Sequence, residues 1–175
     1  MPIFSHQFSG LFLGKNKRKP EPEPLVIEDE LGTFTLSDPE KYHSYSGDTE
    51  MLGRSVTVFL ETDDDGQTTA DAALRHLHSF AANAAGWDEK IKKFAADDFA
   101  EQDGTIETWG GCESDSEGEV ISKEEFIRRI SLNFVQFYRD GSLFLDYSLD
   151  DMFTDHGLGV NADISGKIES CALWG

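Results

Sequence analysis

The stretch from Leu132 to Ser148 reads LNFVQFYRDGSLFLDYS and decides the fold of this chain. Two runs of β-branched, aromatic and other apolar residues stand on either side of the pair Asp140-Gly141. An Asp-Gly pair between β-type runs is a strong hairpin signal, because both residues accept the positive φ that the tightest hairpin turns need. The stretch therefore predicts two antiparallel strands, 132–138 and 142–148.

The same pattern recurs closer to the C-terminus and also upstream. Runs at 158–164 and 167–173 flank Ser165-Gly166 and predict a second hairpin. Together the two hairpins predict a four-stranded antiparallel meander. Short β-type runs nearer the N-terminus predict strands that extend this sheet, at 25–27, 33–36, 42–46 and 55–60.

Between these groups of strands, apolar residues recur at helical spacing. One stripe covers 70–84, with Thr68 and Asp71 placed as a capping box, and a second runs from Trp87 to Phe99. Gly86 separates the two stripes. Because the link is short, we expect these two helices to form an antiparallel pair.

A third, short helix is predicted after Ser122, because Ser122 and Glu125 have the spacing of a capping box. Strands, then helices, then strands is the order of an α+β protein. We expect an antiparallel sheet of hairpins, a meander, with the helical pair and the short helix packed on one face. This single acidic domain would span 25–175. Residues 1–24 hold a basic run and three alternate prolines, which predict an N-terminal arm with a linker.

Charge limits the class of partner. The chain has 175 residues, 34 of them acidic and 15 basic, for a formal net charge of -19. Such a body repels nucleic-acid phosphates and attracts a basic protein surface or cations.

No apolar run approaches the roughly 20 residues of a membrane span. Within 1–24 the basic residues follow the apolar residues, whereas a secretory signal has its basic residues first. The widely spaced Cys112 and Cys171 are expected to be reduced thiols in a cytoplasmic protein.

The sharpest local motif is the acidic segment 113–124, which reads ESDSEGEVISKE. Its acids, its central glycine and its final glutamate have the spacing of an EF-hand calcium loop. Glutamate at the first position and no predicted entering helix favour a solvated acidic loop instead, so both interpretations stay open. The ligands of such a calcium site would be Glu113, Asp115, Glu117, Glu119 and Glu124.

An ordered set of short motifs resembles a bacterial family known only as domain of unknown function 2262. The motifs are ISKEEF at 121–126, YRDGS at 138–142, and DMF at 151–153 with His156 and Gly157. Further likeness upstream extends the resemblance over roughly 30–175. It implies a small bacterial α+β domain and no established activity. The family usually has an aromatic-Gly-His arrangement where this chain has Phe153-Thr154-Asp155-His156.

Three functions follow from these observations. The first is a non-catalytic module that binds a basic protein, with immunity proteins, which mask toxins, as an analogy. The second is calcium binding at 113–124, calcium being the one cofactor considered. The third is a small hydrolase-type enzyme around His156 with Asp151 or Asp155, although a histidine in a structural turn explains the same residues. We assign no catalytic residue and leave the oligomeric state open. The acids expected to contact a partner are Asp63, Asp64, Asp65, Asp115, Glu117 and Glu119.

Overall fold

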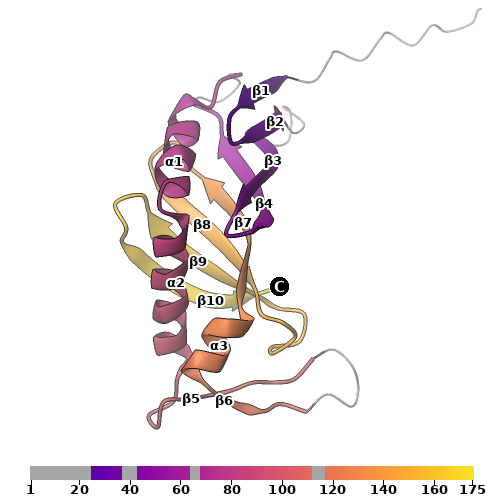
Figure 1. Ribbon diagram of the computed structural model, residues 1–175, viewed down its shortest axis with the longest axis vertical. Helices are drawn as coiled ribbons and strands as arrows, with labels where there is room; N and C mark the ends of the chain where they lie inside the picture. The colour runs from indigo at the N-terminus through magenta and orange to yellow at the C-terminus, as the bar shows by residue number, and fades with distance from the viewer. Residues whose placement is uncertain (1–24, 37–42, 64–67, 112–116) are drawn as a thin grey trace, which may run out of the picture.

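The computed structural model describes residues 25–36, 43–63, 68–111 and 117–175. These residues form a mixed α+β fold with one large sheet, a two-stranded ribbon and three helices (Figure 1). The predicted arm at 1–24 lies outside the described residues. No helix in the described ranges is long and apolar enough to cross a membrane.

The main sheet has eight strands in the order β1-β2-β3-β4-β7-β8-β9-β10. Both predicted hairpins are present, and β7 to β10 form an antiparallel meander. Gly141 and Gly166, in the two turns, have φ of +91° and +99°, which glycine adopts without strain. The strands are β1 Val26–Asp29, β2 Gly32–Leu36, β3 Ser44–Met51, β4 Arg54–Glu61, β7 Ser131–Phe137, β8 Ser142–Ser148, β9 Gly157–Asp163 and β10 Ile168–Trp174.

One pair of strands departs from the antiparallel prediction. β4 and β7 are parallel, with Thr57 opposite Phe134 and Leu60 opposite Phe137. A parallel pair needs a long crossover connection. Here the crossover contains all three helices and the ribbon of β5 (Thr105–Glu107) and β6 (Val120–Ser122), so no simple strand-helix-strand alternation marks it in the sequence.

The helices are α1 (Asp71–Ala81), α2 (Ala84–Phe99) and α3 (Lys123–Arg129). The prediction of an antiparallel pair is wrong: α2 follows α1 end to end along one face of the sheet (Figure 1). The amide of Asn83 donates to the Phe80 carbonyl at 3.0 Å, so the chain keeps turning at the junction instead of reversing. The break therefore lies at Ala82 and Asn83, and Gly86 is inside α2.

The core lies between this layer of helices and the sheet. Alternate strand residues such as Val58, Leu145 and Val160 are fully buried against helical residues such as Leu77 and Ile91. The opposite face of the sheet has no described helix packed on it, and we call it the open face. The side chains that alternate with the core on this face include Phe59, Phe134, Phe144 and Trp174.

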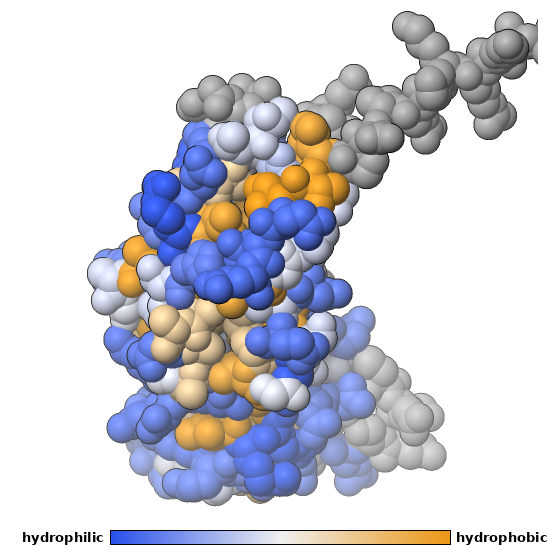
Figure 2. Space-filling view, turned by 45° about the horizontal axis from the view of Figure 1, so that its top comes forward, coloured by the Kyte–Doolittle hydropathy of each residue, from blue (hydrophilic) through white to orange (hydrophobic). Residues whose placement is uncertain are grey.

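The face drawn in Figure 2 is mainly polar, with apolar patches between the polar side chains. Apolar residues are also exposed at the start of the described chain. Leu25 and Val26, at the beginning of β1, are 46% and 44% exposed.

The N-terminus of α1 is capped from a distance. Asp63 accepts hydrogen bonds from the amides of Asp71 and Ala72, both at 2.9 Å. Ala70 at the N-cap position makes no side-chain hydrogen bond. Asp63, which follows β4 in the chain, therefore caps the helix in place of the predicted Thr68 capping box. Partial burial opposes ionisation of Asp63, but hydrogen bonds from α1 and nearby Arg75 hold its pKa below the ordinary value.

We expect Asp63→Ala to lower the free energy of unfolding by about 1 kcal/mol at pH 7, the usual contribution of a cap. Because the folded-state pKa of Asp63 is lowered, this contribution is present above the unfolded pKa of about 4 and is lost as pH falls through the folded value. Urea unfolding at pH 7 and pH 3 measures it. Glu89→Ala, on an exposed helical position, is the control. A loss that stays the same at both pH values would contradict this assignment.

Candidate functional site

A cavity of about 340 Å³ opens where β8, β9 and β10 meet the loop 149–156. We call it the cleft. Its lining is acidic, with one histidine and one exposed tryptophan. The side chains that define it are Asp146, Asp150, Asp151, Asp155, His156 and Trp174.

Asp146 is the unusual residue of the cleft. It lies in the middle of β8 and is only 4% exposed. Both of its oxygens accept hydrogen bonds from neutral groups: Asn133 Nδ2 at 2.7 Å and Trp174 Nε1 at 2.8 Å. No basic side chain in the described part of the chain forms an ion pair with it. A buried carboxylate without a counter-charge is costly, so Asp146 is a functional candidate.

A β-bulge brings Asn133 to this carboxylate. Leu132 pairs with Tyr147 and Phe134 pairs with Asp146, so Asn133 is the extra residue of β7. Bulges turn a side chain away from its regular direction and are frequent beside functional sites. Here the bulge directs the amide of Asn133 to Asp146.

Two glycines of β9 make room for the indole of Trp174. A Cβ at Gly157 would lie 2.6 Å from Asp146 Oδ1 and 3.0 Å from Trp174 Nε1. A Cβ at Gly159 would lie 3.0 Å from the Phe144 ring and 3.2 Å from Trp174 Cδ1. The indole thus occupies a trough that larger residues would fill, and 46% of Trp174 stays exposed.

The loop on the other side of the cleft has a strained backbone. Asp150, Asp151 and Thr154 have φ of 50°, 57° and 58°, a region that non-glycine residues rarely adopt. Such strain is retained where the surrounding structure enforces it, often at functional sites. The amide of Thr154 donates to the Gly110 carbonyl at 2.8 Å. The amide of Trp109 donates to the Met152 carbonyl at 2.9 Å.

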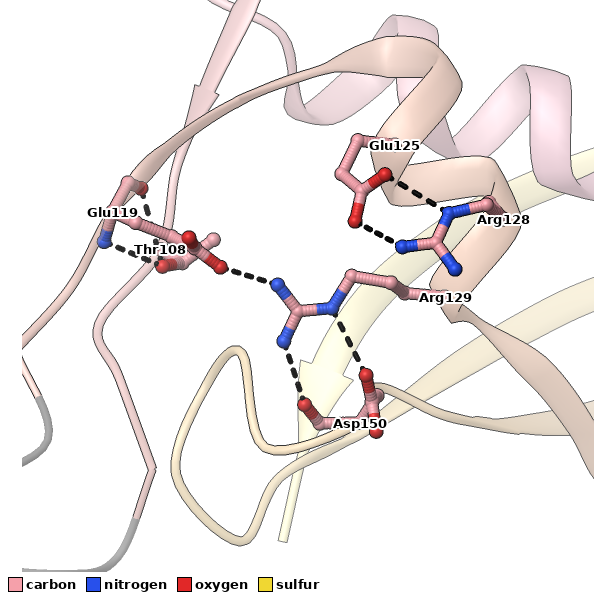
Figure 3. A network of polar contacts seen from close by, with 6 residues as sticks. All are labelled: Thr108, Glu119, Glu125, Arg128, Arg129 and Asp150. Atoms are coloured by element: carbon pink, nitrogen blue, oxygen red, sulfur yellow. Dashed lines mark hydrogen bonds and ion pairs between the residues drawn. The ribbon is translucent and has the colours of Figure 1, made fainter.

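Arg129 holds the same loop from α3 (Figure 3). Its Nε donates to Asp150 Oδ2 and its Nη2 to the Asp150 carbonyl, both at 3.0 Å, while Nη1 pairs with Glu119. The amide of Glu119 donates to Thr108 Oγ1 at 2.9 Å. One guanidinium therefore joins α3, the ribbon and the cleft loop, and its charge is shared between Asp150 and Glu119.

His156 is partly exposed at the rim of the cleft. Its Nδ1 is 3.1 Å from the Phe153 carbonyl and 2.9 Å from Thr154 Oγ1. A carbonyl only accepts, so the bond to Phe153 assigns a proton to Nδ1 and leaves a lone pair on Nε2 of the neutral ring. Asp155 Oδ1 lies 3.6 Å from Nδ1. The residue is thus a hydrogen-bonded turn histidine that also borders the cleft, and its predicted catalytic role stays a prediction.

The acids predicted to contact a partner lie only in part in the described residues. Asp63 caps α1 and Glu119 pairs with Arg129, whereas Glu117 is exposed. Asp64, Asp65 and Asp115 lie outside the described residues.

The predicted calcium ligands are also described only in part. Glu113 and Asp115 are outside the described ranges, and Glu119 is engaged by Arg129. Glu124 lies in the first turn of α3, where a hydrogen bond from its own amide and one from Ser122 lower its pKa. Within the described chain, no group of three or more His, Cys, Asp or Glu residues could hold a metal ion.

Sequence reasoning missed Asp146, Asn133 and Trp174. One signal was present: Asp146 stands between Leu145 and Tyr147 inside a predicted strand, where aspartate is disfavoured. Its partners could not be identified, because the bulge and the position of β10 are set by the tertiary structure.

Comparison with known proteins gives one match. A family model described as "Uncharacterized protein conserved in bacteria (DUF2262)" matches residues 28–173, which include most of the cleft. Neither the curated proteins nor the solved structures contain a match.

We expect Gly157→Ala to disrupt the cleft, because its Cβ would approach Asp146 Oδ1 to 2.6 Å. The indole N–H signal of Trp174 should lose its protection from solvent exchange in NMR spectra. Ser148→Ala, at the cross-strand partner of Gly157, should leave that signal unchanged. An unaltered Trp174 signal in Gly157→Ala would refute the described packing.

Proposed function

The chain belongs to the DUF2262 family of uncharacterised bacterial proteins, and we propose that it is a non-catalytic module whose cleft binds a positively charged group of a protein partner. The observation that carries this proposal is Asp146, a buried carboxylate in an open cavity with only neutral donors around it. A cation that entered the cleft would supply the absent counter-charge. Masking of a basic protein, as immunity proteins do, is one form that this activity would take.

The acidic residues at the rim of the cleft support the same proposal. Arg129 pairs with Asp150, but Asp151 and Asp155 are exposed acids, and Asp155 has an ion-pair contact with His156 alone among the described residues. The field of a chain with net charge -19 attracts basic proteins over a distance and accelerates their association at low salt. The uncompensated rim acids would orient such a partner towards Asp146.

The aromatic side chains of the open face favour a protein over a free metal ion. Phe59 contacts Phe134, Phe134 contacts Phe144, and both Phe134 and Phe144 contact Trp174, with ring centroids 5.6–6.1 Å apart. We call these four residues the aromatic stripe. Partly exposed aromatic residues beside a charged pocket are typical of the central part of protein interfaces. Trp174 belongs to both the stripe and the cleft, so one partner would cover both.

The alternatives receive less support. Acyl and phosphoryl transfer develop negative charge that an enzyme must stabilise, whereas the described lining of the cleft has four aspartates and no lysine or arginine. The calcium alternative lacks a ligand cluster in the described ranges. Binding of a cationic group therefore fits the lining of the cleft better than hydrolysis.

The test uses a peptide that contains both arginine and lysine, titrated by calorimetry at 50 mM and 300 mM salt. We expect salt-sensitive binding that Asp146→Asn weakens about tenfold or more, the usual effect of losing a charge-assisted contact. Asp151→Asn, on the rim, should weaken it less.

Glu89→Gln is the matched control, since it removes the same charge from an exposed position outside the cleft. Melting temperatures establish that each variant is folded. Equal weakening by Asp146→Asn and Glu89→Gln would show that only overall charge matters, which would contradict a site in the cleft.

A further inference from the structure

The orientation of Trp174 is fixed on several sides. Its Nε1 donates to Asp146, and its ring meets Phe134 and Phe144 at interplanar angles of 85° and 83°. The glycine trough of Gly157 and Gly159 lies against the ring atoms Nε1 and Cδ1. Because 46% of the residue is still exposed, a rigid aromatic surface is available at the cleft.

The carboxylate of Asp146 is equally well oriented. Each oxygen accepts one hydrogen bond, from Asn133 or from Trp174, which leaves one lone pair on each oxygen. A planar cation with two parallel N–H groups can bind both oxygens at once, whereas an ammonium binds as a point charge. A guanidinium is also less strongly hydrated than an ammonium, so it enters a nearly buried site more easily.

These two surfaces share one edge. The Nε1–Oδ1 hydrogen bond joins the indole directly to the carboxylate, so a planar cation bound to Asp146 comes close to the ring. Tryptophan is the aromatic residue that binds cations most strongly, and arginine is the cation found most often on aromatic faces. The site thus combines a carboxylate fork with a stacking surface.

Another guanidinium holds the loop from its other side, where it contacts one carboxylate oxygen and the backbone carbonyl of Asp150. Arg129 reaches Asp150 with Nε and Nη2 at 3.0 Å each (Figure 3). Since Arg129 is fully engaged by Asp150 and Glu119, it cannot serve the cleft. No other arginine of the described residues lines the cleft, so we look for the guanidinium in a partner.

We propose that the cleft selects a guanidinium, the arginine side chain of a partner protein, stacked on Trp174 and hydrogen-bonded to Asp146. This inference rests on the proposed function, which requires only a positively charged group. It adds a preference for arginine over lysine.

The test titrates the full chain with N-acetyl-arginine methylamide and, separately, with the lysine and citrulline analogues. Amide signals of Gly157 and Gly159 report binding in NMR spectra. We expect the arginine compound to bind at least about tenfold more tightly than the lysine compound, because only arginine gains both contacts. The neutral citrulline compound should not bind measurably.

Trp174→Leu should remove the preference for arginine, and Asp146→Asn should weaken binding of both cations. Trp109→Leu is the matched control, because Trp109 is also exposed but does not line the cleft. The preference should survive in that variant.

Equal affinity for arginine and lysine compounds would overturn the guanidinium inference and leave the proposed function intact. The same holds if neither compound shifts the cleft signals while the basic peptide still binds in an Asp146-dependent manner. If neither the compounds nor the peptide bind, the proposed function fails as well.

Discussion

The parallel pairing of β4 with β7 is the constraint on which the rest of the structure depends. It joins the N-terminal strands to the C-terminal meander, and it forces everything between Glu61 and Ser131 into one connection. That connection carries α1 and α2 along one face of the sheet (Figure 1). Because the described helices lie on that face, none of them covers the open face. The aromatic stripe and the cleft therefore lie on the open face.

On this open face, the meander arranges residues that do not favour stability individually. Asp146 is buried without a counter-charge, Gly157 and Gly159 weaken β9, and Asp150 and Asp151 have strained φ values. A protein usually departs from local preferences where function requires it. The three departures meet in one cavity, which is a stronger indication of a binding site than any one of them alone.

Local signals in the sequence were sufficient for the strands of the main sheet and for α3, but not for β5 and β6. Asp140-Gly141 and Ser165-Gly166 specify their own turns, and the Ser122 hydroxyl accepts from the amide of Glu125 as its spacing predicts. Features that depend on distant residues were not predictable in this way. The end-to-end junction at Asn83 is stabilised by the stacking of Phe80 on Trp87, and it lies three residues before the glycine expected to break the helix.

The same distinction applies to the candidate site. His156 and the acids of its turn are close in sequence and were recognised, whereas Asn133, Asp146 and Trp174 come from three strands and meet only in the folded sheet. Arg129 likewise connects residues 10 and 21 positions away. A pattern search within a short window does not detect such groups.

The high content of acidic residues has a structural explanation, and this explanation bears on the proposed function. Four aspartates accept a hydrogen bond from the amide two residues further on, which stabilises the turn that each one begins. They are Asp29, Asp103, Asp140 and Asp163. Bonds from the hydroxyl and amide of Ser142, for example, hold the pKa of Asp140 below its ordinary value. Much of the negative charge therefore serves turns, caps and ion pairs. Net charge alone would attract any cation, whereas Asp146 has no structural counter-charge and lies in a shaped cavity, so the proposed selectivity is assigned to Asp146.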